Sequence, residues 1–402
     1  MSKIEELIKE FCPNGVEYVK IKDVFTRLKG TSITAGKMKE IETSNGEIKI
    51  FAGGKTVINA NECDIPNANI TRVPAVLVQS RGVIDFIYYD QPFTFKNEMW
   101  AYTAKNIITV KYLYYVLKNN VQYFRESASG MGALPQISLG VTEDFIVPVP
   151  ALPVQREIVR ILDSFTLYSA ELTAELTARR KQYEFYREKL LTPKAPSYQI
   201  EWKEMKDVCR LVTGATPSTS KKEYWENGTI PWMSSGEVNN KRIFDTEAKI
   251  TELGYKSAST TLVPIHSVVI ALAGQGKTRG KVAVTEIELC TNQSLCSLIC
   301  GKSINYKFLY YYLDGKYEEL RAISNGDGTR GGLSLRLLAP YKIPVPPIEV
   351  QERIVKVLDN FDAICSDLGI GLPAEIEKRQ KQYEYYRDKL LTFEEKNNNG
   401  EK

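Results

Sequence analysis

Apolar side chains recur at heptad spacing through two long stretches of the chain, 148–196 and 344–392. The first stretch carries the apolar stripe at Ile158, Leu162, Phe165, Leu172, Leu176, Tyr183, Tyr186 and Leu190. The second carries it at Ile354, Leu358, Phe361, Tyr383, Tyr386 and Leu390. A heptad stripe kept over about forty residues predicts a helix roughly 60 Å long, which needs a partner to cover its apolar side. We therefore expect the two helices to pack on each other as an antiparallel coiled coil, with a globular domain at each end.

The two helical stretches differ at their centres. The first contains SAELTAELTA (169–178), a tandem four-residue repeat with strong helix propensity. The second contains LGIGLPAE (368–375), in which Gly369, Gly371 and Pro373 predict a break or kink.

These helices belong to a duplication of most of the chain. KQYEFYREKLLT (181–192) returns as KQYEYYRDKLLT (381–392), and VPVPALPVQREIVRILDSF (147–165) returns as IPVPPIEVQERIVKVLDNF (343–361). We expect two globular domains that differ in sequence, each followed by a similar helix. The predicted boundaries are a first domain at 1–147 with an N-terminal helix at 2–11, helices at 148–196 and 344–392, a second domain at 197–343, and a disordered tail at 393–402.

Inside the globular domains the apolar pattern changes to short runs between Gly, Asn and Pro turns. These runs predict strands in EIKIFAGG, AVLVQSRG and VIDFIYYD of the first domain, and in SVVIALAG, KVAVTEI and SLCSLIC of the second. Each domain is expected to end in one helix rich in Tyr and Leu, at 111–124 and 306–322. The predicted fold class is therefore α/β (α+β), duplicated, joined by two long antiparallel helices and pseudo-two-fold symmetric.

Composition narrows the class of protein. The chain has 402 residues, no apolar run long enough to cross a bilayer, and seven cysteines without a C-x-x-C pair, so we expect reduced thiols in the cytoplasm and no zinc site. The one histidine, His266, lies in an apolar run and is expected to be packed in a strand. A chain with one histidine offers few general bases, and a net charge of +4 permits nucleic-acid binding where basic residues cluster.

One segment, ALAGQGKTRG (271–280), resembles the end of a phosphate-binding loop. The first glycine of that motif would fall at Ala271, and the next residues look like a strand where a phosphate-binding loop needs a helix. We interpret the segment as a loop whose Lys277, Arg279 and Lys281 contact DNA phosphates, with a solvated charged hairpin, an ATPase or a nuclease as the alternatives.

Basic residues gather in the turn segments of both domains, next to Ser, Thr, Asn and Gln, the side chains that read base edges. In the first domain we predict DNA contacts from Lys29, Lys37, Lys55, Arg72, Gln79, Arg81 and Asn97. In the second domain we predict them from Ser218, Thr219, Lys221, Ser234, Ser235, Arg242, Gln275, Lys277, Arg279, Asn292, Gln293, Thr329 and Arg330. No catalytic or metal-binding residues are predicted, because Asp85 and Glu98 with Lys96 make only an unconvincing match to a metal-dependent nuclease site.

The paired helix entries and the paired KQYE motifs resemble the specificity subunits of type I restriction–modification systems. GATPSTSKKEYWENGTIPWMSSGEV (214–238) is similar to the start of many target-recognition domains in that family, whereas the first domain has KGTSITAGKMKE in the corresponding place. The resemblance implies that each domain reads one half of a bipartite DNA site, that the helices set the gap, and that two methyltransferase subunits dock on the helices. It also implies motor–nuclease subunits in the full complex, and places S-adenosylmethionine, ATP and Mg²⁺ in those partners. A coiled-coil adaptor without a DNA role is the remaining alternative.

Overall fold

The computed structural model describes residues 3–129, 134–191, 200–274, 278–324, 332–366 and 369–396. The chain divides into two compact units, Met1–Thr173 with Glu375–Lys402, and Ala174–Ala374. Both units mix helices and strands, as the sequence predicts.

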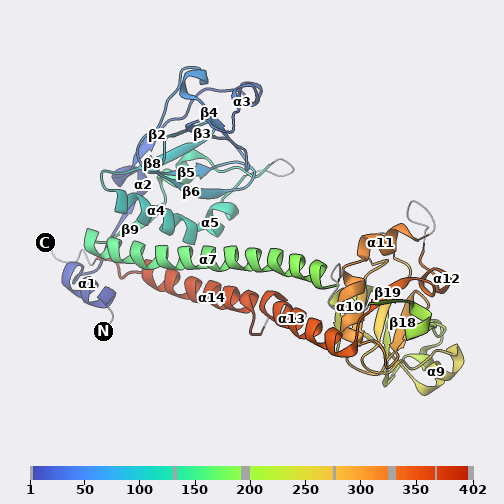
Figure 1. Cartoon of the computed structure of the whole chain (residues 1–402). Helices are drawn as coiled ribbons and strands as arrows, with labels where there is room; N and C mark the ends of the chain where they lie inside the picture. The colour runs from blue at the N-terminus through green and yellow to red at the C-terminus, as the bar shows by residue number, and fades with distance from the viewer. Residues whose placement is uncertain are drawn as a thin grey trace. The chain divides into compact units, whose positions relative to one another are not determined.

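The first unit is built around three small sheets. Its elements are α1 (Lys3–Phe11), β1 (Glu17–Lys20), α2 (Ile21–Val24), β2 (Thr26–Leu28), α3 (Ala35–Ile41), β3 (Ile48–Phe51), β4 (Val57–Ala60), η1 (Glu62–Asp64), β5 (Ala75–Gln79), β6 (Asp85–Tyr89), β7 (Phe93–Phe95), β8 (Trp100–Thr103), α4 (Ile107–Asn119), α5 (Val121–Glu126), α6 (Leu139–Glu143), β9 (Ile146–Val149), the start of α7 (Leu152–Leu191) and most of α14 (Leu372–Leu391). The strand orders are β2-β8-β5-β6, β4-β3-β7 and β1-β9. Helices α4 and α5 lie between the largest of these sheets and α7 (Figure 1).

The second unit repeats this plan. Its elements are the end of α7, β10 (Glu201–Glu204), α8 (Met205–Val208), β11 (Cys209–Thr213), η2 (Lys222–Tyr224), β12 (Ile230–Met233), η3 (Ser235–Asn240), β13 (Arg242–Ile243), β14 (Ala248–Ile250), α9 (Glu252–Ala258), β15 (Val268–Ala271), β16 (Val282–Thr285), β17 (Cys290–Thr291), β18 (Leu295–Cys300), α10 (Tyr306–Asp314), α11 (Tyr317–Ala322), α12 (Leu335–Leu338), β19 (Lys342–Val345) and α13 (Ile348–Ser366).

Strand register shows how closely the two plans agree. The order β11-β18-β15-β16-β13 repeats β2-β8-β5-β6 with one added strand, and β14-β12-β17 repeats β4-β3-β7. In the three-stranded sheet of each unit, the central strand has one antiparallel and one parallel neighbour. Strand β3 pairs antiparallel with β4 and parallel with β7, and β12 pairs antiparallel with β14 and parallel with β17. The domains therefore differ in sequence but share one topology.

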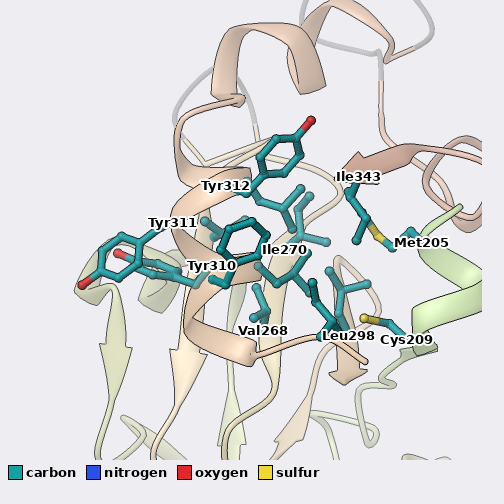
Figure 2. Close-up of a cluster of buried hydrophobic side chains, with 14 of the residues drawn as sticks. Met205, Cys209, Val268, Ile270, Leu298, Tyr310, Tyr311, Tyr312 and Ile343 are labelled. Carbon is teal, nitrogen blue, oxygen red and sulfur yellow. The ribbon is translucent and has the colours of Figure 1, made fainter. Parts of the chain in front are cut away.

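The largest sheet of each unit is covered by a tyrosine-rich helical segment, which the sequence predicts as a single helix. In the structure each segment is split in two, α4 and α5 at Asn120, and α10 and α11 at Gly315 and Lys316. The single-helix prediction is wrong because capping hydrogen bonds from these residues end the first helix of each pair. Figure 2 shows Tyr310, Tyr311 and Tyr312 of α10 beside Val268, Ile270 and Leu298 of the sheet, in the main core of the second unit.

A matched set of polar contacts ties each tyrosine-rich helix to the long helix beside it. Asp163 of α7 accepts hydrogen bonds from Lys111 Nζ at 2.8 Å and from the Tyr115 hydroxyl at 2.5 Å. Asp359 of α13 accepts from Lys307 Nζ at 2.6 Å and from the Tyr311 hydroxyl at 2.7 Å. Burial, and then the neighbouring carboxylate, raise the pKa of both tyrosines, so each phenol stays a neutral donor.

Within each unit, two long helical segments run antiparallel. In the first unit Phe165 of α7 stacks on Tyr386 of α14 with ring centroids 5.6 Å apart. One turn further along α7, the ring of Tyr168 lies under the guanidinium of Arg379, which precedes Tyr386 in α14. In the second unit Tyr186 of α7 stacks on Phe361 of α13 at 5.8 Å. The predicted antiparallel pairing is present inside each unit, and α13 and α14 are separate helices on either side of the predicted glycine break.

Part of the predicted helix–helix stripe also packs against the globular domains. Ile158, Leu162 and Leu390 belong to the core that the first unit forms with its sheet and α4. Ile354 and Leu358 belong to the corresponding core of the second unit, against which Leu190 packs. Each core contains residues of both long helical segments of its unit, so these positions join the two segments and also fasten them to the globular domain. Leu172 is buried and Leu176 half-buried.

Two further expectations fail. Glu394 O accepts a hydrogen bond from Val16 N, and Lys396 N donates to Val16 O, so residues 394–396 are paired with the start of β1 and are not a disordered tail; 397–402 lie outside the described residues. His266 is not a strand residue, because it adopts φ +62° in the turn before β15, where its ring stacks on Tyr306 at 4.4 Å.

Candidate nucleic-acid interface

A hollow that carries basic side chains lies in the first unit where strands β3, β5 and β7 end. Its volume is about 840 Å³. The turn after β3 contributes Gly53, Gly54 and Lys55, the turn after β5 contributes Arg81 and Gly82, and the turn after β7 contributes Lys96 and Glu98. Buried Met38 of α3 also lines it. Three strand ends thus bring polar and basic residues from distant parts of the sequence to one concave surface.

The charge of this hollow is mainly positive, because four cationic side chains line it together with two carboxylates, those of Glu42 and Glu98. In the described part of the chain, Lys39, Lys55 and Arg81 are not engaged in ion pairs, whereas Lys96 pairs with Glu98 at 2.9 Å. Unpaired cations that line one concave surface attract a polyanion such as the phosphate backbone of DNA. The predicted DNA contacts Lys55 and Arg81 lie here, and the exposed Asn97 lies in the same turn as Lys96.

The second unit places the other predicted contacts at the corresponding strand ends. Asn292 and Gln293 follow β17, as Lys96 and Asn97 follow β7. Gln293 accepts a hydrogen bond from the Thr216 hydroxyl, which joins this turn to the segment that carries Ser218 and Thr219. Ser218 and Thr219 are both exposed. The fold therefore brings these residues together, and their contact with DNA stays a prediction.

A pair of glycines explains part of the family-like pattern at 214–238. Gly214 approaches the carbonyl oxygen of Thr291 so closely that a Cβ would collide with it, and Trp232 Nε1 donates to Ala215 O at 3.0 Å. These contacts hold the 215–218 segment against the end of β17. In the first unit Gly30 approaches the carbonyl of Phe95 in the same way, so the two unlike loops share one anchor.

Several predicted DNA contacts of the first domain are engaged elsewhere. Gln79 is buried and its side-chain amide donates to Gly54 O at 2.8 Å, so it fixes a turn and is not presented to a ligand. Arg72 is paired with Glu62, and Lys37 with Glu40 at 2.9 Å. Lys29 is exposed but is not among the residues that line the hollow.

Several predicted contacts of the second domain also have partners within the fold. Ser234 caps η3 in a capping box with Glu237, in which Ser234 N donates to Glu237 Oε2 at 2.6 Å, and half-buried Ser235 follows it. Arg279 is buried. Arg242 is paired with Glu286 and lines a separate cavity of about 640 Å³ beside α10 and α13. Lys221 is exposed and lies 5.0 Å from the ring centroid of Tyr224.

The phosphate-binding-loop alternative does not fit the fold. Strand β16 follows the loop and pairs antiparallel with β15, whereas a phosphate-binding loop needs a helix directly after it. Gln275, Lys277, Thr329 and Arg330 lie outside the described residues. Over the described ranges, no group of three or more His, Cys, Asp or Glu side chains has metal-binding geometry, and no helix is long and apolar enough to cross a membrane.

A second candidate surface lies on the repeated KQYE motif. Phe185 and Tyr385 occupy the same position in the two motifs, and their side chains are 60% and 64% exposed. The neighbouring Tyr183 and Tyr383 instead turn toward Phe361 and Phe165 of the antiparallel helix, at 6.2 and 6.3 Å. Because exposed aromatic residues at matched sites contribute nothing to either core, they mark candidate protein contacts.

Sequence reasoning missed the place of Glu98 in this hollow and the outward direction of Phe185 and Tyr385. Helical periodicity alone would have placed Phe185 off the stripe, but it gave no reason to single it out. Glu98 has no sequence signal beyond the unconvincing nuclease pattern, because its surroundings come from three strands far apart in the chain.

Comparison with known proteins points to one family. The family model described as "Type I restriction modification DNA specificity domain" matches residues 13–179 and 199–378. The specificity subunit of the Escherichia coli type I enzymes EcoR124I and EcoR124II is 38% identical over 297 residues, 72% of each chain. A putative type I specificity subunit of Mycoplasma pneumoniae is 27% identical over 380 residues, covering 93% of this chain and 97% of that protein.

Solved structures share the fold. The S subunit of a type I restriction–modification system from M. genitalium superposes with a TM-score of 0.58 at 18% identity, covering 94% of this chain and 95% of that one. A second structure, described under the assembly and conformational transition of a type I system, gives a TM-score of 0.54 at 16% identity over 94% of this chain and 98% of that one. With both halves matched by the family model, this chain belongs to the DNA specificity subunits of type I restriction–modification systems.

Proposed function

We propose that this chain recognises a bipartite, asymmetric site on duplex DNA, with one half read by each globular domain and the gap set by the helices. The observation that carries the proposal is the repetition of one topology with different residues at the same strand ends. After β7 the first domain has Lys96, Asn97 and Glu98, whereas after β17 the second has Asn292, Gln293 and Ser294. Two domains with the same strand topology but different residues at the strand ends suit a DNA site whose two halves differ in sequence.

The proposal includes partner subunits. Two methyltransferase subunits dock on the helices, and motor–nuclease subunits join the full complex; the structural neighbour that concerns assembly of a type I system supports a multi-subunit complex. The matched exposure of Phe185 and Tyr385 supports two equivalent docking sites, because an identical partner needs the same surface twice. The chain itself is proposed to be non-catalytic and cytoplasmic, with S-adenosylmethionine, ATP and Mg²⁺ bound by the partners.

DNA recognition is tested with the complex of this chain and its methyltransferase. Mapping methylated bases in the genome is expected to give two short specified segments separated by an unspecified gap. Lys55→Ala and Arg81→Ala are each expected to weaken binding to all duplexes and to lower the slope of log affinity against log salt by about 1, because each removes one phosphate contact. Lys105→Ala, an exposed lysine that does not line the hollow, is the matched control. A contiguous site, or unchanged salt slopes, would contradict the proposal.

Docking of the methyltransferase subunits is tested by introducing a negative charge at each of the two matched aromatic positions. Phe185→Asp and Tyr385→Asp are each expected to leave one methyltransferase bound where the native chain binds two, and the double variant to bind none. Phe11→Asp, which changes an exposed aromatic residue outside the motif, controls for added charge. Native mass spectrometry of the complexes reads the stoichiometry directly.

The variant Lys277→Ala distinguishes the ATPase alternative from the DNA-reading function. An ATPase would lose turnover in this variant, whereas a DNA reader would lose affinity and salt dependence and would have no ATP turnover of its own to lose. A coiled-coil adaptor without a DNA role would show no sequence preference in a gel shift with its partner present.

A further inference from the structure

One ion pair stands apart from the other charges of the hollow in the first unit. Lys96 Nζ lies 2.9 Å from Glu98 Oε1, and both side chains line the hollow. The other charged residues of its lining are Lys39, Glu42, Lys55 and Arg81. The side chain of Lys96 is 22% exposed to solvent and that of Glu98 is 36% exposed. A carboxylate is therefore present in a basic hollow, within reach of whatever enters it.

The backbone under this pair is firmly held. Lys96 N donates to Phe51 O at 2.9 Å, and Met99 N donates to Lys96 O at 2.9 Å, which closes a tight turn. The carbonyl oxygen of Glu98 accepts a hydrogen bond from the hydroxyl of buried Ser80 at 2.9 Å. These contacts fix where the two side chains start, so the pair is pre-organised, as a specificity-determining contact requires.

The charge of Glu98 decides what it can bind. A carboxylate only accepts hydrogen bonds and repels phosphate, so it weakens a purely electrostatic DNA surface. It becomes favourable when it meets a donor, and the donors that the major groove presents are the exocyclic amines of cytosine and adenine. Lys96 only donates, and its preferred base partner is guanine, at O6 and N7.

In a C·G pair these complementary groups lie side by side, because cytosine N4 and guanine O6 are hydrogen-bonded to each other, about 3 Å apart. The two polar atoms of the Lys96–Glu98 pair have nearly the same separation. We propose that Glu98 and Lys96 together read one C·G base pair in the half-site of the first domain, with Glu98 accepting from cytosine N4 and Lys96 donating to guanine. This inference rests on the proposed DNA-reading function and assigns it a residue and a base pair.

The corresponding turn of the second domain carries no charge. Asn292, Gln293 and Ser294 occupy the positions of Lys96, Asn97 and Glu98, and Asn292 Oδ1 accepts from Ser294 N at 3.0 Å. A neutral turn cannot make the same charge-assisted contacts. The C·G contact is therefore specific to the half-site of the first domain.

The test uses the complex with methyltransferase and a set of duplexes that vary one base pair at a time. Glu98→Ala is expected to reduce the preference for C·G at one position of one half-site roughly tenfold or more, and to leave every other position, including the second half-site, unchanged. Lys55→Ala is the control and should weaken binding to all duplexes alike, because a phosphate contact carries no base information. The exchange Lys96→Glu with Glu98→Lys is expected to move the preference at that position toward G·C.

Each outcome bears on the inference. If Glu98→Ala binds with unaltered preference at every position, or relaxes an A·T pair instead, the Lys96–Glu98 assignment is overturned while the bipartite reading remains. If the native complex shows no sequence preference, the proposed function itself fails. A thermal unfolding curve of Glu98→Ala that matches the native chain ensures that a loss of preference does not come from an unfolded domain.

Discussion

Gly30 and Gly214 occupy positions where the backbone leaves no room for a side chain. Each lies where the chain passes close to a carbonyl oxygen at the end of the parallel strand, Phe95 in one unit and Thr291 in the other. Because the contact is with backbone, the neighbour has no side-chain freedom with which to make room. The loop that follows each glycine depends on this close approach.

Gly30→Ala is therefore expected to lower the free energy of unfolding by about 3 kcal/mol, since the added Cβ forces a backbone shift. Gly36→Ala is the matched control, because its Cβ would have its nearest neighbour 4.0 Å away and its residue lies in α3. That control should be neutral or more stable by about 0.5 kcal/mol. Thermal unfolding of both variants checks the prediction, which equal midpoints would contradict.

Glu157 offers a pH-dependent test. Its side chain is 6% exposed and pairs with Arg160 at 2.7 Å and with Lys3 of α1 at 3.2 Å. The hydrogen bond from Arg160 is the main reason why the pKa of Glu157 is lowered from its ordinary value of 4.5. A lowered pKa means that the ionised carboxylate stabilises the fold fully above pH 4.5 and that this stability is lost as pH falls through the folded pKa.

Glu157→Gln should thus be less stable than the native chain by about 1 kcal/mol at pH 7, with the difference shrinking below pH 4.5. Glu352→Gln, which changes an exposed glutamate at the start of α13, should show little difference at any pH. Unfolding midpoints of the three proteins across this pH range decide the question. A difference that grows on acidification would have the wrong sign.

Residue chemistry could be read from the sequence only in part. Lys55 and Arg81 were found because basic turn residues are visible in any sequence, and they do line one hollow. The roles of Gln79 and Ser234 within the fold could not be predicted, because their hydrogen bonds to Gly54 and within the capping box arise only after the chain has folded. Glu98 was missed for the same reason.

The elements divide in a similar way. Heptad spacing predicted α7, and the glycines predicted the gap between α13 and α14, because both signals are local. Periodicity does not distinguish a residue that faces a neighbouring helix from one that faces the sheet below, so it could not show that Ile158 and Leu162 also pack into the core of the first unit. The same apolar stripe serves both surfaces along one helix.

The helix pair makes a prediction for Tyr183. This side chain is half-buried and its ring centroid lies 6.2 Å from that of Phe361. Burial raises its pKa, so the phenol is neutral. Tyr183→Asp replaces an aromatic contact with a desolvated charge and is expected to lower stability by about 2–4 kcal/mol. Phe185 lies two residues away but is 60% exposed, so the free energy of unfolding of Phe185→Asp should differ from that of the native chain by no more than about 0.5 kcal/mol. Both are expected to weaken methyltransferase binding, whereas base preference should change in neither.

Circular dichroism melting separates the two variants, and methylation mapping of the surviving complex tests base preference. An intact complex with altered specificity in Tyr183→Asp would contradict the role assigned to this residue. Equal unfolding midpoints for the two variants would contradict the assignment of Tyr183 to the helix pair and of Phe185 to the exposed surface.

For the molecule as a whole, duplication has a functional consequence. The shared topology keeps the positions of strand ends the same in both units, while the residues at those ends are free to differ. In the proposed function, recognition of bases and spacing between half-sites are separate properties, the first assigned to the turns and the second to the helices. The sequence could predict this division because the helices repeat strongly and the domains weakly, but the shared strand order of the domains is evident only from the fold.

Deletion of Thr173–Leu176 tests this separation. The segment lies within α7, in the tandem AELTAELTA repeat, and its loss removes about 6 Å of helix, close to two base-pair steps of 3.4 Å. Both half-sites are expected to keep their bases, while the gap between them shortens, because no residue at a strand end has changed. Duplication of the same four residues should lengthen the gap, which controls for a general disturbance of the helix. Methylated bases mapped in strains carrying each variant give half-sites and gap together, and altered half-site bases at the original gap would mean that the helices contribute to base recognition and do not set the spacing.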